Sequence, residues 1–149
     1  RETDSLWSQL AGKAVTGPLA GTSLRLLPVA ETTWSRWKGE HQATLVLSFQ
    51  TGFQRDYSSD PYRDWPLDRR LSLVVSYKGV TRIYPYSELK KSGPSLKDEI
   101  AALPITIVFD LKNQIVTVRS SGEEQLPHFV CFFADAKSFF PEAHVFKAR

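Results

Sequence analysis

Hydrophobic residues recur in two related stretches near the two ends of the chain. The first stretch is 27–47 and the second is 126–146, so the second is the first moved forward by 99 positions. Only four of the 21 positions are identical, but both stretches contain a Leu-Pro pair, a short run, an aromatic helical pattern and a β-prone run. The pattern predicts an internal duplication, with two related helix-then-strand units around a β-rich middle.

The helical part of each unit carries large apolar side chains on one face. Positions spaced i, i+3 and i+7 share a helix face, and these positions hold Trp34, Trp37 and His41 in the first unit and Phe133, Ala136 and Phe140 in the second. We expect both faces to pack in the core, because related units bury equivalent faces against a shared sheet. An exposed aromatic binding stripe at Trp34–Trp37 is the alternative, and a ligand site between the two units stays open.

Alternating and β-branched runs predict strands through the rest of the chain. Lys78-Gly79 and Leu111–Asn113 each separate two such runs, which indicates two hairpins. The predicted strands are 23–28, 44–49, 71–77, 80–84, 104–110 and 114–118. Residues 14–21 contain Gly17-Pro18 and Gly21, so we expect a turn or an extended edge there.

Capping signals predict three further short helical segments. Asp4 precedes apolar positions at helical spacing and predicts a helix over 4–10. Ser87 opens a second helix, which Gly93-Pro94 ends. Ser95 is followed three residues later by Asp98, as in a capping box, which favours a helical turn over 95–100.

These elements predict a single α+β domain over residues 1–149, with a mixed, mostly antiparallel sheet and short helices. Helices long enough for repeated parallel crossovers are missing from the pattern, which excludes a doubly wound fold. The chain opens at Arg1 without Met, so we expect it to be the C-terminal part of a longer or processed protein.

Composition excludes several classes of protein. With 42% hydrophobic and 23% charged residues the chain is globular. The net charge of +3 is diffuse, whereas nucleic-acid binding needs Lys and Arg gathered on one face. No apolar run approaches the ~18 residues of a membrane-spanning helix, and no signal peptide is present.

The stretch Arg55–Trp65 has the densest mixture of polar and aromatic residues, within a connection that shows no sustained period. In one hypothesis its aromatic rings stack on a sugar or peptide while its carboxylates accept hydrogen bonds. The candidate ligand-binding residues are then Arg55, Asp56, Tyr57, Asp60, Tyr62 and Trp65.

A second hypothesis for this stretch is a Ca²⁺ site, because Ca²⁺ favours oxygen ligands in irregular geometry. Asp56, Asp60 and Asp64 are the candidate ligands, although their spacing matches no EF-hand. In the purely structural alternative, nearby arginines neutralise the aspartates and the aromatic rings fix the loop to the core. These arginines are Arg55, Arg63, Arg69 and Arg70.

Signals for catalysis are poor. Cys131 lies among apolar residues that favour burial and a raised pKa. A Cys131–His128 dyad is conceivable if both lie on a helix, but the neighbouring Pro127 and apolar residues favour burial. The sequence contains no nucleophile elbow, glycine-rich phosphate loop or CxxC motif. We therefore expect no catalytic residues and no cofactor other than the Ca²⁺ candidate.

Five motifs in series resemble the bacterial family called domain of unknown function 3179. They are the stretches 4–9 (DSLWSQ), 17–21 (GPLAG), 33–37 (TWSRW), 55–62 (RDYSSDPY) and 84–89 (YPYSEL). The resemblance runs from about Glu2 to about Val145 and implies an exported or envelope-associated bacterial protein with no established reaction. Members of the family are longer and carry a cysteine pair ahead of the first motif, so no role of those cysteines transfers to this chain.

The sequence and the resemblance together predict a non-catalytic binding or scaffold module with residues 55–65 as its ligand surface. Its expected partner is a protein, a small molecule or a carbohydrate. The alternative is an enzyme or metal protein whose site is completed by an N-terminal segment or a partner chain.

Overall fold

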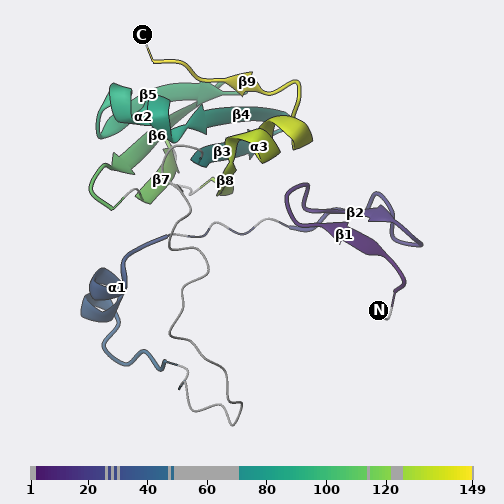
Figure 1. Ribbon diagram of the computed structural model, residues 1–149, viewed down its shortest axis with the longest axis horizontal. Helices are drawn as coiled ribbons and strands as arrows, with labels where there is room; N and C mark the ends of the chain where they lie inside the picture. The colour runs from purple at the N-terminus through teal and green to yellow at the C-terminus, as the bar shows by residue number, and fades with distance from the viewer. Residues whose placement is uncertain are drawn as a thin grey trace.

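The computed structural model describes residues 3–25, 27, 29, 31–46, 48, 71–113, 115–121 and 126–148. Within these residues three short helices and nine strands form an α+β domain, as predicted (Figure 1). The helices are α1 (Trp34–Glu40), α2 (Tyr86–Ser92) and α3 (Phe133–Phe139). The strands are β1 (Leu6–Ser8), β2 (Lys13–Thr16), β3 (Leu71–Tyr77), β4 (Val80–Pro85), β5 (Ser95–Ile100), β6 (Leu103–Asp110), β7 (Ile115–Ser120), β8 (His128–Phe132) and β9 (His144–Val145).

Two sheets make up the body of the molecule. The first has the order β8-β3-β4-β9, in which β8 is antiparallel to β3 and β9 is parallel to β4. The second is the antiparallel sheet β5-β6-β7. Both predicted hairpins are confirmed, because β3 pairs with β4 across Lys78-Gly79 and β6 pairs with β7 across residues 111–113.

One cluster of buried side chains joins the two sheets. Leu73 and Tyr84 of the first sheet belong to the same cluster as Ile107 and Phe109 of the second, and each is at most 1% exposed. Burial alternates along β6, which is the period of a strand with one face in the core. The α2 helix closes the cluster with Tyr86, whose ring meets Phe109 edge-on at a centroid distance of 4.9 Å.

The opposite face of the first sheet is covered by α3. Val74 and Ile83 form a second buried cluster with Ala136 of the helix. Strand β3 is therefore buried on both faces, which explains why Leu73, Val74 and Val75 are consecutive apolar residues instead of alternating with polar ones. On the same face the hydroxyl of Ser72 is buried without a hydrogen-bond partner among the described residues.

The helical turn predicted over 95–100 is wrong, because these residues form strand β5. Asp98 is not a capping residue, since its carboxylate accepts two hydrogen bonds of 2.8 Å from Arg82 and one of 2.8 Å from the Tyr84 hydroxyl. This network links β4 to β5. Pairing with β6 therefore outweighs the local capping signal, as tertiary contacts commonly do for short segments.

The helix predicted over 4–10 is also wrong. Residues 6–8 form β1, which pairs antiparallel with β2, and the meander continues to Ser23 through a bridge to Lys13. Gly17 is required here because its φ is +86° and a Cβ would contact the carbonyl oxygen of Asp4. The predicted strand over 23–28 is reduced to this bridge within the described residues.

The helices of the two predicted units begin and end with similar backbone geometry. Thr33 and Phe132 precede the helices with φ and ψ of −75° and 148°, and of −65° and 142°. At the other end the His41 amide donates to the Trp37 carbonyl at 2.8 Å, and the Phe140 amide donates to the Ala136 carbonyl at 2.9 Å. The next bond repeats as well, from Thr44 to His41 at 3.1 Å and from Ala143 to Phe140 at 3.0 Å. Each pair is separated by 99 positions.

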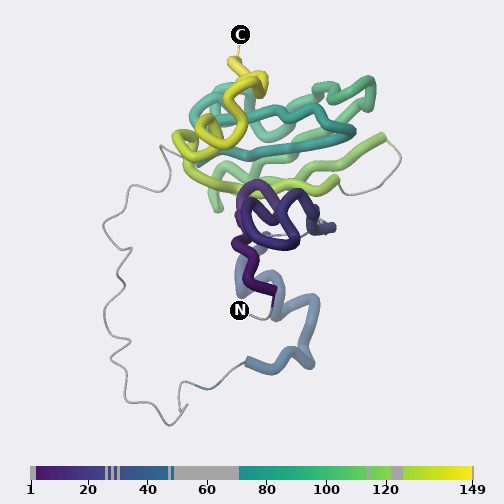
Figure 2. Tube along the Cα trace, turned by 90° about the vertical axis from the view of Figure 1, so that its right-hand side faces the viewer, coloured from purple at the N-terminus to yellow at the C-terminus, as the bar shows by residue number. Residues whose placement is uncertain are grey.

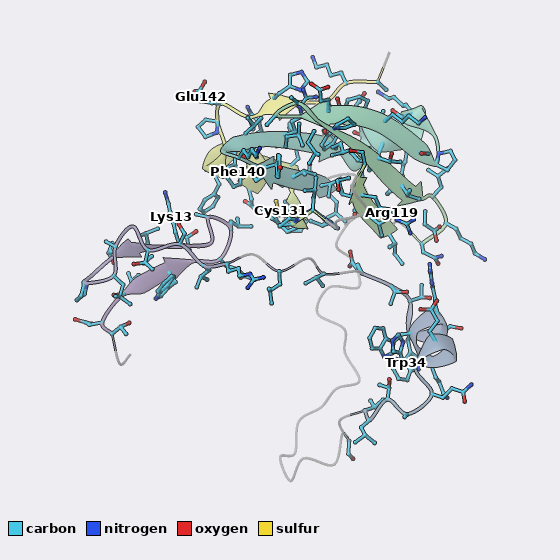
Figure 3. The ribbon with its side chains drawn as sticks, turned by 180° about the vertical axis from the view of Figure 1, so that it is seen from behind. Lys13, Trp34, Arg119, Cys131, Phe140 and Glu142 are labelled. Atoms are coloured by element: carbon cyan, nitrogen blue, oxygen red, sulfur yellow. The ribbon has the colours of Figure 1, made fainter. Side chains whose placement is uncertain are left out.

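The surroundings of the two helices differ. Ala136 is 1% exposed, whereas its counterpart Trp37 is 40% exposed and Trp34 is 54% exposed. The expectation of core packing therefore holds for the second unit and is wrong for the first, where α1 has no buried residue. Figure 3 shows Trp34 on a helix that lies away from Cys131 on strand β8 and from Phe140 at the end of α3.

The strand predicted over 44–49 does not form in its described part. Residues 44–46 pair with no strand there, and Leu45 is 96% exposed. Figures 1 and 2 show α1 and the β1–β2 hairpin on the same side of the body, beyond β8. The residues before position 48 thus form a region distinct from the packed body of residues 71–148.

Candidate functional site

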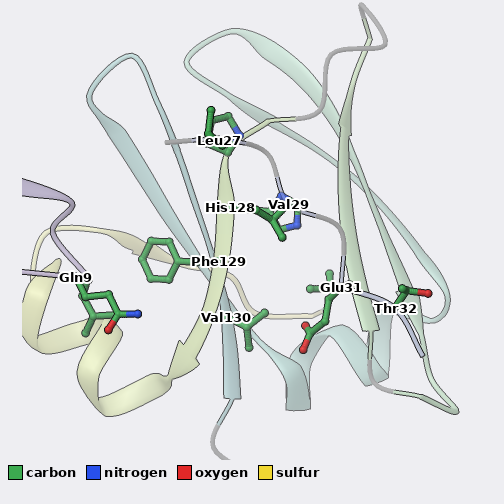
Figure 4. A pocket seen from close by; sticks show the side chains of 11 residues that line it. Gln9, Leu27, Val29, Glu31, Thr32, His128, Phe129 and Val130 are labelled. Atoms are coloured by element: carbon green, nitrogen blue, oxygen red, sulfur yellow. The ribbon is translucent and has the colours of Figure 1, made fainter. Parts of the chain in front are cut away.

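A groove of about 720 Å³ lies between the first unit and the second. One wall is strand β8 with the preceding Pro127, and the other is the extended segment at the start of the first unit. Figure 4 shows Val29 beside His128, with Gln9 of the N-terminal hairpin on the Phe129 side of the strand. The lining residues are Gln9, Leu10, Leu27, Val29, Glu31, Thr32, Val116, Pro127, His128, Phe129 and Val130.

Pairing with β3 places strand β8 at the groove. Its residues pair with β3 from Leu71↔Phe132 to Val75↔His128, and β8 ends the strand order of its sheet. The groove therefore runs along an edge strand. An edge strand presents backbone N–H and C=O groups on its outer side, which is a template for pairing with another extended segment.

The walls of the groove are mostly apolar. Leu27 and Val29 are each 64% exposed, and they face a strand whose side chains are half-buried. A volume of this size falls within the ~300–1,000 Å³ range of ligand sites, which are commonly apolar with a few convergent polar groups. The polar groups here are those of Gln9, Glu31, Thr32 and His128.

His128 is held in one tautomer in its neutral form. Its Nδ1 lies 2.8 Å from the carbonyl oxygen of Leu126, and a carbonyl can only accept a hydrogen bond. Nδ1 therefore carries the hydrogen, and Nε2 is left with a lone pair. Because Leu126 is buried at 3% exposure, this bond fixes the ring at the base of the strand.

Glu31 connects the groove to the core of the body. Its negative charge is close enough to Tyr86 to add to the effect of burial, and both raise the pKa of the Tyr86 hydroxyl. Glu31 and Thr32 also line a smaller hollow of about 110 Å³ with Asp110 and Asn113 of the β6–β7 turn. The extended segment of the first unit thus lies against both sheets.

The sequence-predicted ligand surface, Arg55–Trp65, lies outside the described residues. The same holds for the aspartates of the Ca²⁺ hypothesis, Asp56, Asp60 and Asp64, so both hypotheses stay predictions. In the described part of the chain no three His, Cys, Asp or Glu side chains gather in the manner of a metal site.

The structure does not contain the arrangement that a Cys131–His128 dyad requires. Both residues lie on strand β8 and not on a helix, so their odd spacing directs the side chains to opposite faces of the sheet. His128 faces the same side as Val75, whereas Cys131 is opposite Ser72 beneath α3. Burial, together with the nearby carboxylate of Asp135, raises the pKa of the Cys131 thiol, which disfavours the reactive thiolate.

Sequence reasoning missed most of the groove residues. Gln9 and Glu31 stand alone in the sequence as ordinary polar residues, and no motif marks them. The available signal was the repeated Leu-Pro pair, because Leu27 and Pro127 line opposite walls of the groove. The expectation that a ligand site could lie between the two units is the one that this geometry supports.

The fold and the groove define a small α+β domain with a ligand-sized groove at an edge strand. The model of the family described as protein of unknown function (DUF3179) matches residues 1–139, and the chain belongs to this family. The comparison confirms the resemblance found in the five motifs. Neither the curated proteins nor the solved structures give a match. None of the described helices is long and apolar enough to cross a membrane.

Proposed function

We propose that the protein is a non-catalytic binding module that takes up an extended polypeptide segment along the edge of strand β8. The observation that carries this function is the groove of about 720 Å³, in which apolar side chains of the first unit face that edge. An added strand would form main-chain hydrogen bonds with β8, which supply affinity. Pockets for alternate side chains would supply specificity.

The character of the walls defines the ligand. Leu27 and Val29 favour apolar side chains on the ligand, and Glu31 favours a cationic or hydrogen-bond-donating group near the β7 side of the groove. The Nε2 lone pair of His128 accepts a hydrogen bond in the same groove. The expected ligand is an extended peptide that alternates apolar residues with Lys, Ser or Thr.

Fluorescence anisotropy with labelled eight-residue peptides tests this function. We expect saturable binding of a peptide that alternates Val with Lys or Thr. No binding is expected for the same composition interrupted by prolines, which cannot donate to a strand. Leu27→Asp should weaken binding at least about tenfold, which corresponds to about 1.4 kcal/mol. Leu111→Asp is the matched control, because Leu111 is 47% exposed on the β6–β7 turn. Equal effects of the two substitutions would refute the site.

The predicted surface at residues 55–65 is a second candidate. Its Ca²⁺ version is tested by a thermal melt with Ca²⁺ and with EDTA, for the wild type and for Asp56→Ala/Asp60→Ala. Binding to the folded state alone stabilises it by about 2.7 kcal/mol at a hundredfold excess over the dissociation constant. A Ca²⁺-dependent shift in the wild type that is absent in the variant would assign the site.

Two further elements of the proposal concern the origin of the two units and the location of the protein. The shared geometry of α1 and α3, with equivalent bonds 99 positions apart, supports descent of the two units from one duplicated segment. The family resemblance supports an exported or envelope-associated location.

An enzyme or metal protein completed by a further segment or a partner chain remains the alternative, and His128 would then be the residue whose substitution abolishes activity.

A further inference from the structure

His128 is the residue of the β8 groove whose charge responds to mild changes in pH. Histidine is the side chain that gains or loses its charge between about pH 5 and pH 8. His128 is half-buried in the wall of the groove, and Figure 4 shows its ring beside Val29 of the opposite wall. A change in the charge of His128 therefore acts directly on the space in which the ligand lies.

Protonation of His128 changes only one of its two ring nitrogens. Nδ1–H already donates to the carbonyl oxygen of Leu126 at 2.8 Å, and both ring nitrogens are donors in the protonated ring. The bond to Leu126 is thus kept in both states, and the ring stays in place. Nε2 alone changes, from a neutral acceptor to a cationic donor in the groove.

The charge that faces His128 across the groove is that of Glu31. It is the other titratable group among the described residues that line the groove. The neighbouring elements β3, β7 and the N-terminal hairpin contribute the uncharged side chains of Val75, Val116 and Gln9. Asp135 of α3 lies near Cys131, on the opposite face of the sheet. The charges of Glu31 and His128 therefore cancel when His128 is protonated and leave the groove negative when it is neutral.

We propose that His128 makes binding in this groove pH-dependent, so that a cationic peptide segment binds at neutral pH and is released in mild acid. The inference rests on the proposed function, because it concerns the same groove and the same extended ligand. Neutral His128 accepts a hydrogen bond from a ligand Lys, whereas the protonated ring offers no acceptor and opposes the like charge. A ligand hydroxyl can both donate and accept, so it suits either state of the ring.

The test measures fluorescence anisotropy of two labelled peptides with the full chain at about pH 7.5 and about pH 5. One peptide alternates Val with Lys and the other alternates Val with Thr. Both are acetylated and amidated, so neither titrates in this range. We expect the Val–Lys peptide to bind the wild type about tenfold less tightly at the lower pH, because a hydrogen bond is replaced by like-charge repulsion. The Val–Thr peptide should change by less than about twofold.

Two histidine variants locate the pH dependence. His128→Asn retains an amide N–H that can donate to the Leu126 carbonyl but does not titrate, so binding of the Val–Lys peptide should become independent of pH. His144→Asn is the matched control, because this exposed histidine lies on β9 and does not line the groove. It should keep the response of the wild type. Binding of the Val–Thr peptide to each variant reports that the groove is intact.

The switch is overturned if both peptides respond equally to pH in the wild type, or if His144→Asn removes the response. A response that persists in His128→Asn would assign it to Glu31 instead. Loss of both peptides in His128→Asn would make the ring a structural part of the groove and would also overturn the switch. If both peptides bind the wild type with a ratio of affinities that is independent of pH, the switch fails and the proposed function stands. If neither peptide binds at either pH, the proposed function fails and the switch fails with it.

Discussion

A short helix with similar backbone geometry at both ends occurs twice in this protein, once packed in the body and once outside it. In residues 71–148 the α3 helix covers a sheet whose strand β3 is buried on both faces. In residues 3–48 the α1 helix has no buried residue, and this region holds ten of the fifteen large hydrophobic side chains that are exposed in the described chain. Local sequence therefore fixes the helix and its caps, while burial depends on the strands available beside it.

The comparison also shows where the stability of the molecule resides. A two-stranded hairpin and a helix of seven residues are each marginal alone in water. The body instead joins seven strands and two helices through two shared clusters of buried side chains. Substitutions in the two regions should therefore differ in their effect on the free energy of unfolding.

The largest effect is expected for removal of a core ring. Phe109→Ala should lower the free energy of unfolding by about 3–5 kcal/mol, because it leaves a cavity beside Tyr86. Trp37→Ala should change it by less than about 0.5 kcal/mol, as is usual for surface positions. Chemical denaturation of both variants measures the difference. An equal loss in the two would mean that α1 is part of the cooperative core.

A smaller effect is expected when the second unit is given the residue of the first. Ala136→Trp should destabilise the body by about 1–3 kcal/mol, because the indole would overpack against Val74 and Ile83. The smaller substitution Ala136→Val adds less volume at the same position. Its stability should therefore lie between those of Ala136→Trp and the wild type. Thermal melts provide the comparison. A neutral Ala136→Trp would contradict the close approach of α3 to the sheet.

The stability of the body should fall at alkaline pH. Burial raises the pKa of Tyr84 and of Tyr86 above the ordinary tyrosine value of about 10, with further increases from Asp98 and Glu31 respectively. The folded state thus retains these protons while the unfolded chain loses them, so stability is full below pH ~10 and declines above it by up to about 1.4 kcal/mol per pH unit for each tyrosine. Tyr86→Phe should reduce this slope in urea unfolding measured from pH 9 to 11. An unchanged slope would show that Tyr86 does not contribute.

The smallest effect concerns a rate. Cys131 should react with iodoacetamide more slowly than an exposed thiol at pH 8, because burial and Asp135 raise its pKa. Leu45→Cys in a Cys131→Ser background supplies that exposed thiol within the first unit. Mass spectrometry of the alkylated chain gives both rates. Faster reaction at Cys131 would indicate that α3 does not cover this strand.

The sequence predicted most of the body. Lys78-Gly79 and the alternation over 103–110 specify hairpins locally, and the Thr33 side chain caps α1 by accepting from the Arg36 amide. The predictions failed in two short segments, residues 4–10 and Ser95–Asp98, whose sequences are compatible with either a helical turn or a strand. There, pairing with a neighbouring strand outweighed a capping signal of about 1 kcal/mol.

The candidate site was less accessible to sequence reasoning. Glu31, His128 and Gln9 come from three distant parts of the chain and share no motif. Their proximity depends on β8 lying at the edge of its sheet and on the first unit lying beside it, which are long-range features. The polar-aromatic stretch 55–65 remains a prediction from sequence.

The sequence by itself determined the family, the α+β class and both body hairpins, because these depend on residue order and local backbone preference. Only the tertiary structure decided that Trp37 is exposed while Ala136 is buried, and that an edge strand faces the first unit across a groove. The physical reason is that a periodic apolar face specifies a helix without specifying its partner. Burial is a property of what packs against that face, and the two units differ in this respect.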